Sequence, residues 1–167
     1  MEIPSTEHMA TFAKASYTMG QKHLSKNKRL QETNDLTSKT SYVINPDYTN
    51  SEISVFQHKD NPKNIVISMR GTKIDGRRGK KDIINDLAVA TGNAGGEPTF
   101  KRRKQRVNKI IKELKPNGLH MTSHSLGGAT QNYTIANSNI LKKYINDGNT
   151  LVRGPLMALK ILPLVMI

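Results

Sequence analysis

Residues 121–129 read MTSHSLGGA. Apolar residues precede Ser125, and two glycines, Gly127 and Gly128, follow it, which predicts a strand that reverses into a helix within a few residues. The pattern is close to the nucleophile elbow G-x-S-x-G. So tight a corner forces its central residue into strained backbone angles, and the residues two positions before and after it must be small. Ser123 and Gly127 meet that requirement, with Ser123 standing where the pattern has glycine.

This corner has two chemical consequences. It lifts the Ser125 hydroxyl clear of the end of the sheet, and it directs the Leu126 amide, at a helix N-terminus, toward the place where an oxyanion would form. We expect the His124 side chain to point away from the Ser125 hydroxyl and to pack or form a hydrogen bond beneath the turn. A five-residue pattern is weak evidence alone because serine and glycine are common, so its context decides.

Apolar periodicity along the chain predicts alternating strands and helices. Strands are expected at 41–45, 51–58, 64–70, 119–123 and 150–152, and helices at 8–19, 82–90, 99–114 and from 127 to about 147. Ser5 or Thr6 is expected to cap the first helix. The polar residues 20–39 predict a frayed helix followed by a loop. Antiparallel strands thus come first, and a βαβ unit of an α/β fold follows them.

The composition limits the class of protein. A length of 167 residues fits one domain, and 35% hydrophobic residues indicates a thin core. The net charge of +13 suggests an anionic partner, such as nucleic acid, an anionic membrane or an acidic protein, unless it simply keeps the surface solvated. The absence of cysteine excludes disulfides and thiolate metal sites. The histidines and aspartates have no metal-ligand spacing, so we expect neither metal nor cofactor.

Neither end of the chain predicts membrane targeting. The N-terminus has early acidic residues and no apolar h-region, so we expect no secretory signal peptide. The apolar C-terminal stretch is interrupted by Arg153, Pro155, Lys160 and Pro163. It falls short of the ~20 apolar residues that a membrane span needs. These features favour an intracellular location.

The helix expected at 99–114 carries an apolar face and an otherwise basic surface. Its cations include Lys101, Arg102, Arg103, Lys104, Arg106 and Lys109. With the basic loop 73–81 they could form a strip that binds phosphates of nucleic acid or an anionic lipid surface. Sequence-specific readout is not expected, because Phe100 is the only aromatic residue nearby. The plainest alternative is a solvated helix face.

Three segments together resemble the class 3 lipases, the fungal lipase-like branch of the α/β-hydrolases. They are IVISMRGT (65–72), NDLAVATG (85–92) and TSHSLGGA (122–129). In that family an apolar strand ends in Arg-Gly-Thr or Arg-Gly-Ser, an Asp-Leu pair follows in the lid region, and the elbow reads Gly-His-Ser-Leu-Gly-Gly-Ala. The resemblance spans roughly residues 41–152, and the motifs keep the family's order.

The resemblance implies an α/β-hydrolase-like sheet with flanking helices in a single domain, 1–167. Residues 1–40 would be an N-terminal helix and polar segment, 41–152 the lipase-like core, and 153–167 an apolar tail of unassigned role. Ser125 would be the nucleophile, with oxyanion donors from Thr72 and from the Leu126 backbone amide. The substrate would be a lipid ester, triacylglycerol or phospholipid, whose acyl group passes to Ser125 and then to water.

The resemblance also covers a lid segment and two charged residues. Residues 73–98 would form a lid over an apolar acyl pocket. For Arg70 and Asp86, an ordinary ion pair is as good an interpretation as a direct role.

The chain departs from the family at the acid and the base. The family's order is nucleophile, acid, base, yet the only acid after Ser125 is Asp147, and all five histidines precede it: His8, His23, His58, His120 and His124. We therefore leave the triad acid and base unassigned. The expectation we favour is a truncated chain whose sheet is incomplete at its C-terminal end. The others are an inactive relative, or a base from His58 or a second chain. A rival function is a non-catalytic basic module that binds anionic lipid or nucleic acid through helix 99–115.

Overall fold

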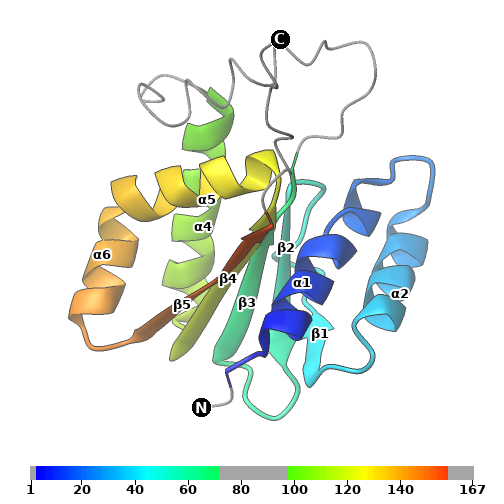
Figure 1. Cartoon of the computed structure of the whole chain (residues 1–167), viewed down its shortest axis with the longest axis horizontal. Coiled ribbons are helices and arrows are strands. Elements are labelled where there is room, and N and C mark those ends of the chain that lie inside the picture. Colours follow the sequence, from blue (N-terminus) through cyan, green and yellow to red (C-terminus); the bar gives the residue numbers. More distant parts are fainter. Residues whose placement is uncertain (1–2, 72–97, 158–167) are drawn as a thin grey trace, which may run out of the picture.

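A five-stranded mixed sheet forms the centre of the molecule (Figure 1). The computed structural model describes residues 3–71 and 98–157. The strands are β1 (Tyr42–Ile44), β2 (Ile53–His58), β3 (Asn64–Met69), β4 (Gly118–His124) and β5 (Thr150–Met157), in that spatial order. The first three strands pair antiparallel, whereas β3, β4 and β5 run parallel. This confirms the predicted α/β fold, in which antiparallel strands precede a βαβ unit.

Helices cover both faces of the sheet. On one face lie α1 (Thr6–Ala15), the short 3-10 helix η1 (Thr18–Gly20) and α2 (Lys26–Leu36). On the other lie α4 (Pro98–Leu114), α5 (Leu126–Asn137) and α6 (Asn139–Asn146). Because strand side chains alternate between faces, Ile65 and Ile67 pack toward α4 while Val66 packs toward α1.

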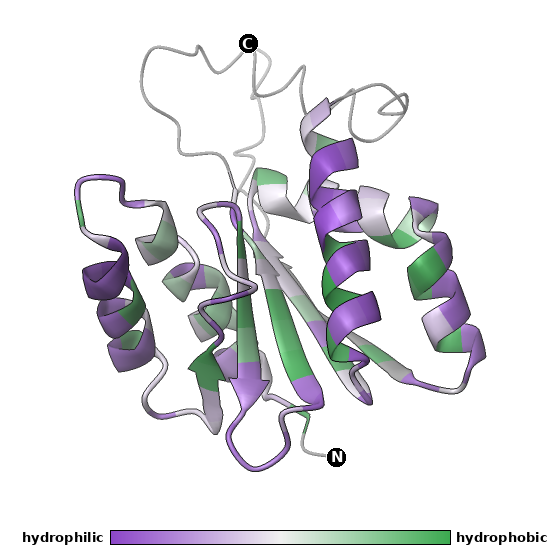
Figure 2. Cartoon of the chain, turned by 180° about the vertical axis from the view of Figure 1, so that it is seen from behind, coloured by the Kyte–Doolittle hydropathy of each residue, from purple (hydrophilic) through white to green (hydrophobic). Residues whose placement is uncertain are grey.

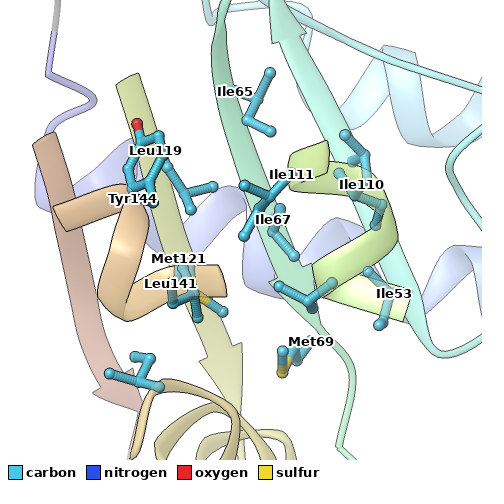
Figure 3. Packing of buried hydrophobic residues seen from close by; sticks show 13 residues of the cluster. Ile53, Ile65, Ile67, Met69, Ile110, Ile111, Leu119, Met121, Leu141 and Tyr144 are labelled. Carbon is cyan, nitrogen blue, oxygen red and sulfur yellow. The ribbon is translucent and has the colours of Figure 1, made fainter. Parts of the chain in front are cut away.

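The larger core lies between the sheet and α4 to α6 (Figure 3). Ile67 of β3 and Met121 of β4 are fully buried there, with Ile110 from α4 and Leu141 from α6. Each such side chain contributes about 1.5–3 kcal/mol by leaving water. This core holds β3 and β4 as the central parallel pair, so their carboxyl ends lie at the same edge of the sheet.

Hydroxyl groups attach α1 to the opposite face. Ser68 Oγ donates to the carbonyl of Phe12 at 3.2 Å, and Thr122 Oγ1 donates to that of Met9 at 3.1 Å. Ser5 caps the helix by accepting from an amide in its first turn at 3.2 Å, as predicted. Helix α1 is thereby fixed across β3 and β4, although it ends at Ala15, earlier than expected.

The helix and following loop predicted for residues 20–39 are present, but the helix is regular and not frayed: α2 occupies Lys26–Leu36. Specific hydrogen bonds hold it in place. Ser25 is its N-cap, Arg29 Nη1 donates to the Met19 carbonyl at 2.9 Å, and Asn34 Oδ1 accepts from the Ile44 amide at 3.0 Å. Only Thr33 is buried in this helix. Apolar periodicity therefore carries no signal for it.

The single helix expected from 127 to about 147 is two helices. The break falls at Ser138, which has an extended backbone (φ −96°, ψ 109°) and ends α5. Its hydroxyl accepts from the Leu141 amide at 3.0 Å, which starts α6. The last strand also extends beyond the expected 150–152, to Met157. The helix expected at 82–90 lies outside the described residues.

The surface is polar where the helices face water. Figure 2 shows α4 as mostly hydrophilic, with largely hydrophobic strands behind it. Across the described ranges, none of the helices combines the length and apolar character that crossing a membrane requires.

Candidate active site

Ser125 alone forms the corner between β4 and α5. Strand β4 ends at His124 and α5 begins at Leu126. The Ser125 backbone has φ 55° and ψ −131°, and in the described part of the chain Lys115 is the only other non-glycine residue with positive φ. A backbone conformation of this kind costs about 1–3 kcal/mol. The strain predicted for this position is confirmed.

Other serines show what Ser125 does not do. Ser5, Ser25 and Ser138 are N-caps with negative φ, and each side chain accepts a hydrogen bond from an amide of its helix. Ser125 is also an N-cap, yet its side chain makes no capping hydrogen bond. Helix capping therefore does not explain a serine at this corner.

Close packing enforces the corner. A Cβ atom on Gly127 would lie 2.2 Å from the Met69 carbonyl oxygen, so the start of α5 runs directly against the end of β3. Ser123, two residues before the corner, is 1% exposed. The Gly128 amide donates to the Ser125 carbonyl at 2.8 Å and closes the first turn. The expectation that small residues flank Ser125 holds: Gly127 has no room for a side chain, and Ser123 is buried.

The chain that leaves β3 runs beside the corner. Met69 pairs with Ser123 in the sheet. Two residues later, a Cβ atom on Gly71 would lie 2.5 Å from the His124 carbonyl oxygen and 3.0 Å from Ser125 Cβ. Thr72, the expected oxyanion donor, comes next in sequence, but it lies outside the described residues, as does the lid segment up to residue 97.

Leu126, the second expected oxyanion donor, is the first residue of α5. The first amides of a helix have no acceptor within that helix, and the helix dipole makes this end partly positive. The Leu126 amide therefore belongs to a group of donors suited to hold negative charge next to Ser125.

His124 and Tyr17 form a pair beside the corner. The Tyr17 hydroxyl and His124 Nδ1 lie 2.8 Å apart, and the rings meet edge to face with centroids 5.4 Å apart. Burial raises the pKa of Tyr17, against the opposing influence of Arg70, the Gly71 backbone and Arg103. His124 thus makes the expected hydrogen bond with Tyr17, which lies two residues after the end of α1. Sequence reasoning missed Tyr17, because the two residues lie 107 positions apart.

His58 is not placed to act as the triad base. It ends β2, which is antiparallel to β3, so it lies at the edge of the sheet opposite Ser125. Its Nδ1 accepts from the amides of Asp60 and Asn61 at 3.1 and 3.2 Å. The suggestion that His58 supplies the base is therefore wrong. Asp147 also lies at the far edge, where it caps α6 just before β5 and pairs with Lys143 at 3.0 Å.

His120 is a buried structural histidine in the middle of β4. It is fully buried, and its Nε2 lies 2.9 Å from Asn64 Oδ1. Burial lowers the pKa of His120 to about 4, so the ring stays neutral near pH 7. It contributes to the core between the sheet and α1 and is separated from Ser125 by the rest of the strand.

One cation of the expected basic surface is buried near the end of β3. Arg103 is 5% exposed, and its Nη1 donates to the Arg70 carbonyl at 2.8 Å. Glu52 pairs with Arg102 at 2.6 Å and lies 3.8 Å from Arg103 Nε. Burial raises the pKa of Glu52, but the Arg102 hydrogen bond and the charges of Arg103, Arg102 and Arg70 outweigh it, so the pKa lies below its usual value. Arg103 thus braces the end of β3.

The other cations of α4 do not form a uniform strip either. Arg106 Nη2 donates to the Tyr48 carbonyl at 3.2 Å, and Lys104 Nζ lies 5.7 Å from the centre of the Tyr133 ring. Lys109 forms an exposed ion pair with Glu113, and Lys101 is exposed. Of the six cations expected at the surface, Arg103 is buried, so its inclusion in a solvent-facing strip was wrong. The basic loop 73–81 lies outside the described residues.

A shallow hollow of about 520 Å³ opens beside the corner. It is lined mainly by α1, through Glu7, Ala10, Thr11 and Lys14, and completed by Tyr17 and His124. Among the residues that the structure describes, no three histidine, aspartate or glutamate side chains gather closely enough to hold a metal ion.

The corner therefore combines a serine hydroxyl that makes no capping hydrogen bond with helix amides beside it, and a hollow along α1 reaches the neighbouring His124. No protein-family model matches this chain, and neither a curated protein nor a solved structure matches it.

Proposed function

We propose that this protein is a serine ester hydrolase of the class 3 lipase type that acts on a lipid ester, with Ser125 as the nucleophile. The observation that carries the proposal is the positive φ of Ser125 at the end of β4. Strain of this kind persists only where the surrounding structure over-determines it, and it is concentrated at functional sites. The hydrolase-like character of the sheet is part of the same proposal.

The proposed reaction is acyl transfer in two steps. Ser125 Oγ attacks the ester carbonyl, and the alcohol departs with a proton, which leaves an acyl group bonded to Oγ. Water then attacks that acyl group, releases the acid and restores the hydroxyl. The Leu126 amide holds the oxyanion together with a donor that follows β3, a role that the family resemblance gives to Thr72.

The base remains the missing part of this proposal, and a second chain is one source for it. Loss of a triad member leaves about 10³–10⁴-fold acceleration over water. Turnover by this chain alone is therefore expected to be slow. A covalent probe of the hydroxyl is a better test than product formation, because a single slow attack by Ser125 leaves a stable adduct that accumulates with time.

The test is labelling of the folded chain with a fluorophosphonate, followed by mapping of the modified residue. We expect the label on Ser125 and none on the Ser125→Ala variant. Ser123→Ala is the matched control, since it removes a buried hydroxyl two residues away and should keep the label. A label that persists in Ser125→Ala, or a folded wild-type chain that takes no label, would rule the proposal out.

A basic binding module is the second candidate, and the contacts of α4 weaken it. Arg103 is buried, and Arg102 and Arg106 bond to acceptors of the protein itself. This candidate predicts that affinity for DNA or anionic vesicles falls steeply between low and physiological salt. A flat salt response would remove it.

A further inference from the structure

The hollow of about 520 Å³ follows one face of α1 and ends at the His124 ring. The residues of α1 in its wall recur every three or four positions, so they lie along one stripe of the helix. They are Glu7, Ala10, Thr11 and Lys14. Thr122 bonds to the first half of α1, whereas His124, two residues further along β4, meets Tyr17 just beyond the helix end (Figure 1). The stripe therefore leads from the Ser125 corner back toward the first turn of α1.

Most polar groups of this wall are already engaged within the protein. The Thr11 hydroxyl donates to the Glu7 backbone carbonyl at 3.0 Å. The Tyr17 hydroxyl lies 2.8 Å from His124 Nδ1. Lys14 and Glu7 are exposed instead, and neither side chain forms an ion pair with another residue that the structure describes. The wall therefore offers one ammonium group and one carboxylate to a ligand.

These two charges have a fixed order along the hollow. Lys14 lies nearer the Ser125 corner, and Glu7 lies two helical turns further away, about 10 Å along the axis of α1. A ligand whose ester carbonyl sits at Ser125 and whose polar end follows the stripe meets the cation first and the carboxylate second. A phospholipid with an amine headgroup carries the complementary sequence: an ester, then a phosphate, then an ammonium. A triacylglycerol carries no charge and would use neither side chain.

We infer that the hollow along α1 is a headgroup site for phospholipids whose phosphate carries an ammonium group. The inference rests on the proposed function and narrows its lipid ester to this class. The Lys14 ammonium binds the phosphate, since hydrogen bonds between a cation and an anionic oxygen are the strong ones. The Glu7 carboxylate attracts the headgroup cation, and Ala10 and the Tyr17 ring supply carbon atoms to the wall between the two ends. The volume of about 520 Å³ lies within the range of small-molecule sites, about 300–1,000 Å³.

The experiment measures, by calorimetry, the binding of dihexanoyl phosphatidylcholine to the full chain, with this short-chain lipid kept below its micelle concentration. Ser125→Ala is the background, so that the lipid is not consumed while it binds. We expect Lys14→Gln to raise the Kd about 5–10-fold. Lys142→Gln is the matched control, because it removes the same charge from an exposed lysine of α6, on the opposite face of the sheet, and it should keep the background Kd.

Two other ligands test the order of the charges. Dihexanoyl phosphatidylglycerol keeps the phosphate and the acyl chains but lacks the ammonium. Glu7→Gln should therefore raise the Kd of phosphatidylcholine about 3–5-fold and leave that of phosphatidylglycerol unchanged or lower. Inorganic phosphate should bind more weakly than phosphatidylcholine, since it contacts Lys14 alone.

A protection experiment connects the hollow to the corner. In the chain with Ser125 intact, bound phosphatidylcholine should slow fluorophosphonate labelling of Ser125, because its ester then occupies the corner. The Lys14→Gln variant should need about 5–10-fold more lipid for the same protection. Equal protection in the wild type and in Lys14→Gln would overturn the inference.

The outcomes separate the two proposals. The headgroup site is overturned if phosphatidylcholine does not bind, if Lys14→Gln keeps the background Kd, if Glu7→Gln affects both lipids equally, or if inorganic phosphate binds as tightly as the lipid. Labelling of Ser125 in the wild type leaves the proposed function standing in each of these cases. Lipid binding that depends on Lys14 and Glu7, in a folded wild-type chain that takes no label, supports the site and refutes the proposed hydrolysis.

Discussion

Replacing Gly127 with alanine tests how closely α5 packs on β3. A Cβ atom there would lie 2.2 Å from the Met69 carbonyl oxygen and 3.0 Å from the carbonyl carbons of Met69 and Arg70. All three atoms belong to the backbone at the end of a central strand, so no side chain can rotate out of the way. Since ordinary contact begins near 3.4 Å, the helix start must retreat from the strand by roughly 1 Å.

The expected cost is a balance of two opposing effects. Helix propensity favours alanine over glycine by up to about 1 kcal/mol. Overpacking of a buried position costs about 1–3 kcal/mol and sometimes more, and the rigid backbone neighbour places Gly127 at the upper end. We therefore expect a net loss of about 2 kcal/mol in the free energy of unfolding. For a chain of this size that corresponds to a fall of roughly 4–8 °C in Tm.

Urea unfolding followed by circular dichroism measures this loss. Gly148→Ala is the matched control, because Gly148 has φ 82° and a Cβ atom there meets nothing within 4 Å. It carries the backbone penalty of about 1 kcal/mol without any overlap. The reasoning is refuted if Gly127→Ala is as stable as the wild type, or if it loses less stability than Gly148→Ala.

Three further predictions concern titration, charge and strain. The pKa of His120 is about 4 in the folded chain and 6.5 in the unfolded chain, so the free energy of unfolding should fall by about 3 kcal/mol as the pH decreases from 6.5 toward 4. The urea midpoints at pH 7.5 and pH 5 should therefore differ less in His120→Gln than in the wild type. Glu52→Gln should destabilise by about 1–3 kcal/mol because Arg103 loses its anionic partner, whereas Arg102→Ala, at an exposed side chain, should cost less than about 1 kcal/mol in the same assay. Ser125→Gly should raise the free energy of unfolding by roughly 1 kcal/mol, because glycine accepts a positive φ. A free energy of unfolding below that of the wild type would contradict the strain at this corner.

The parts of the fold that sequence reasoning predicted are those set by local patterns. Apolar runs bounded by turn residues mark β2, β3 and β4, and the glycines after Ser125 mark the corner. The regularity of helix α2 was not predicted, because hydrogen bonds to backbone groups outside the helix, such as that between Asn34 and Ile44, hold it. Such bonds leave no trace in periodicity.

The burial of Arg103 is a different case, because a signal existed. Arg103 precedes Val107 and Ile110 by four and seven residues, so it lies on the apolar face of its own helix. A count of the cations in the helix does not reveal this spacing. The Tyr17 hydroxyl, in contrast, meets His124 only because α1 crosses β3 and β4, and that crossing depends on the whole sheet.

The energetics of Ser125 connect the fold to the proposed chemistry. A serine N-cap ordinarily gains about 1 kcal/mol from its capping bond, as Ser5, Ser25 and Ser138 are placed to do here. Ser125 forgoes that bond and also accepts a strained φ, a further 1–3 kcal/mol or so. The fold sustains this cost because Gly127 packs directly on β3. A serine with an extended backbone at position 125 would move the helix away from that strand. The same packing that makes the corner costly leaves the hydroxyl unbonded to its helix, which is what a nucleophile at this position requires.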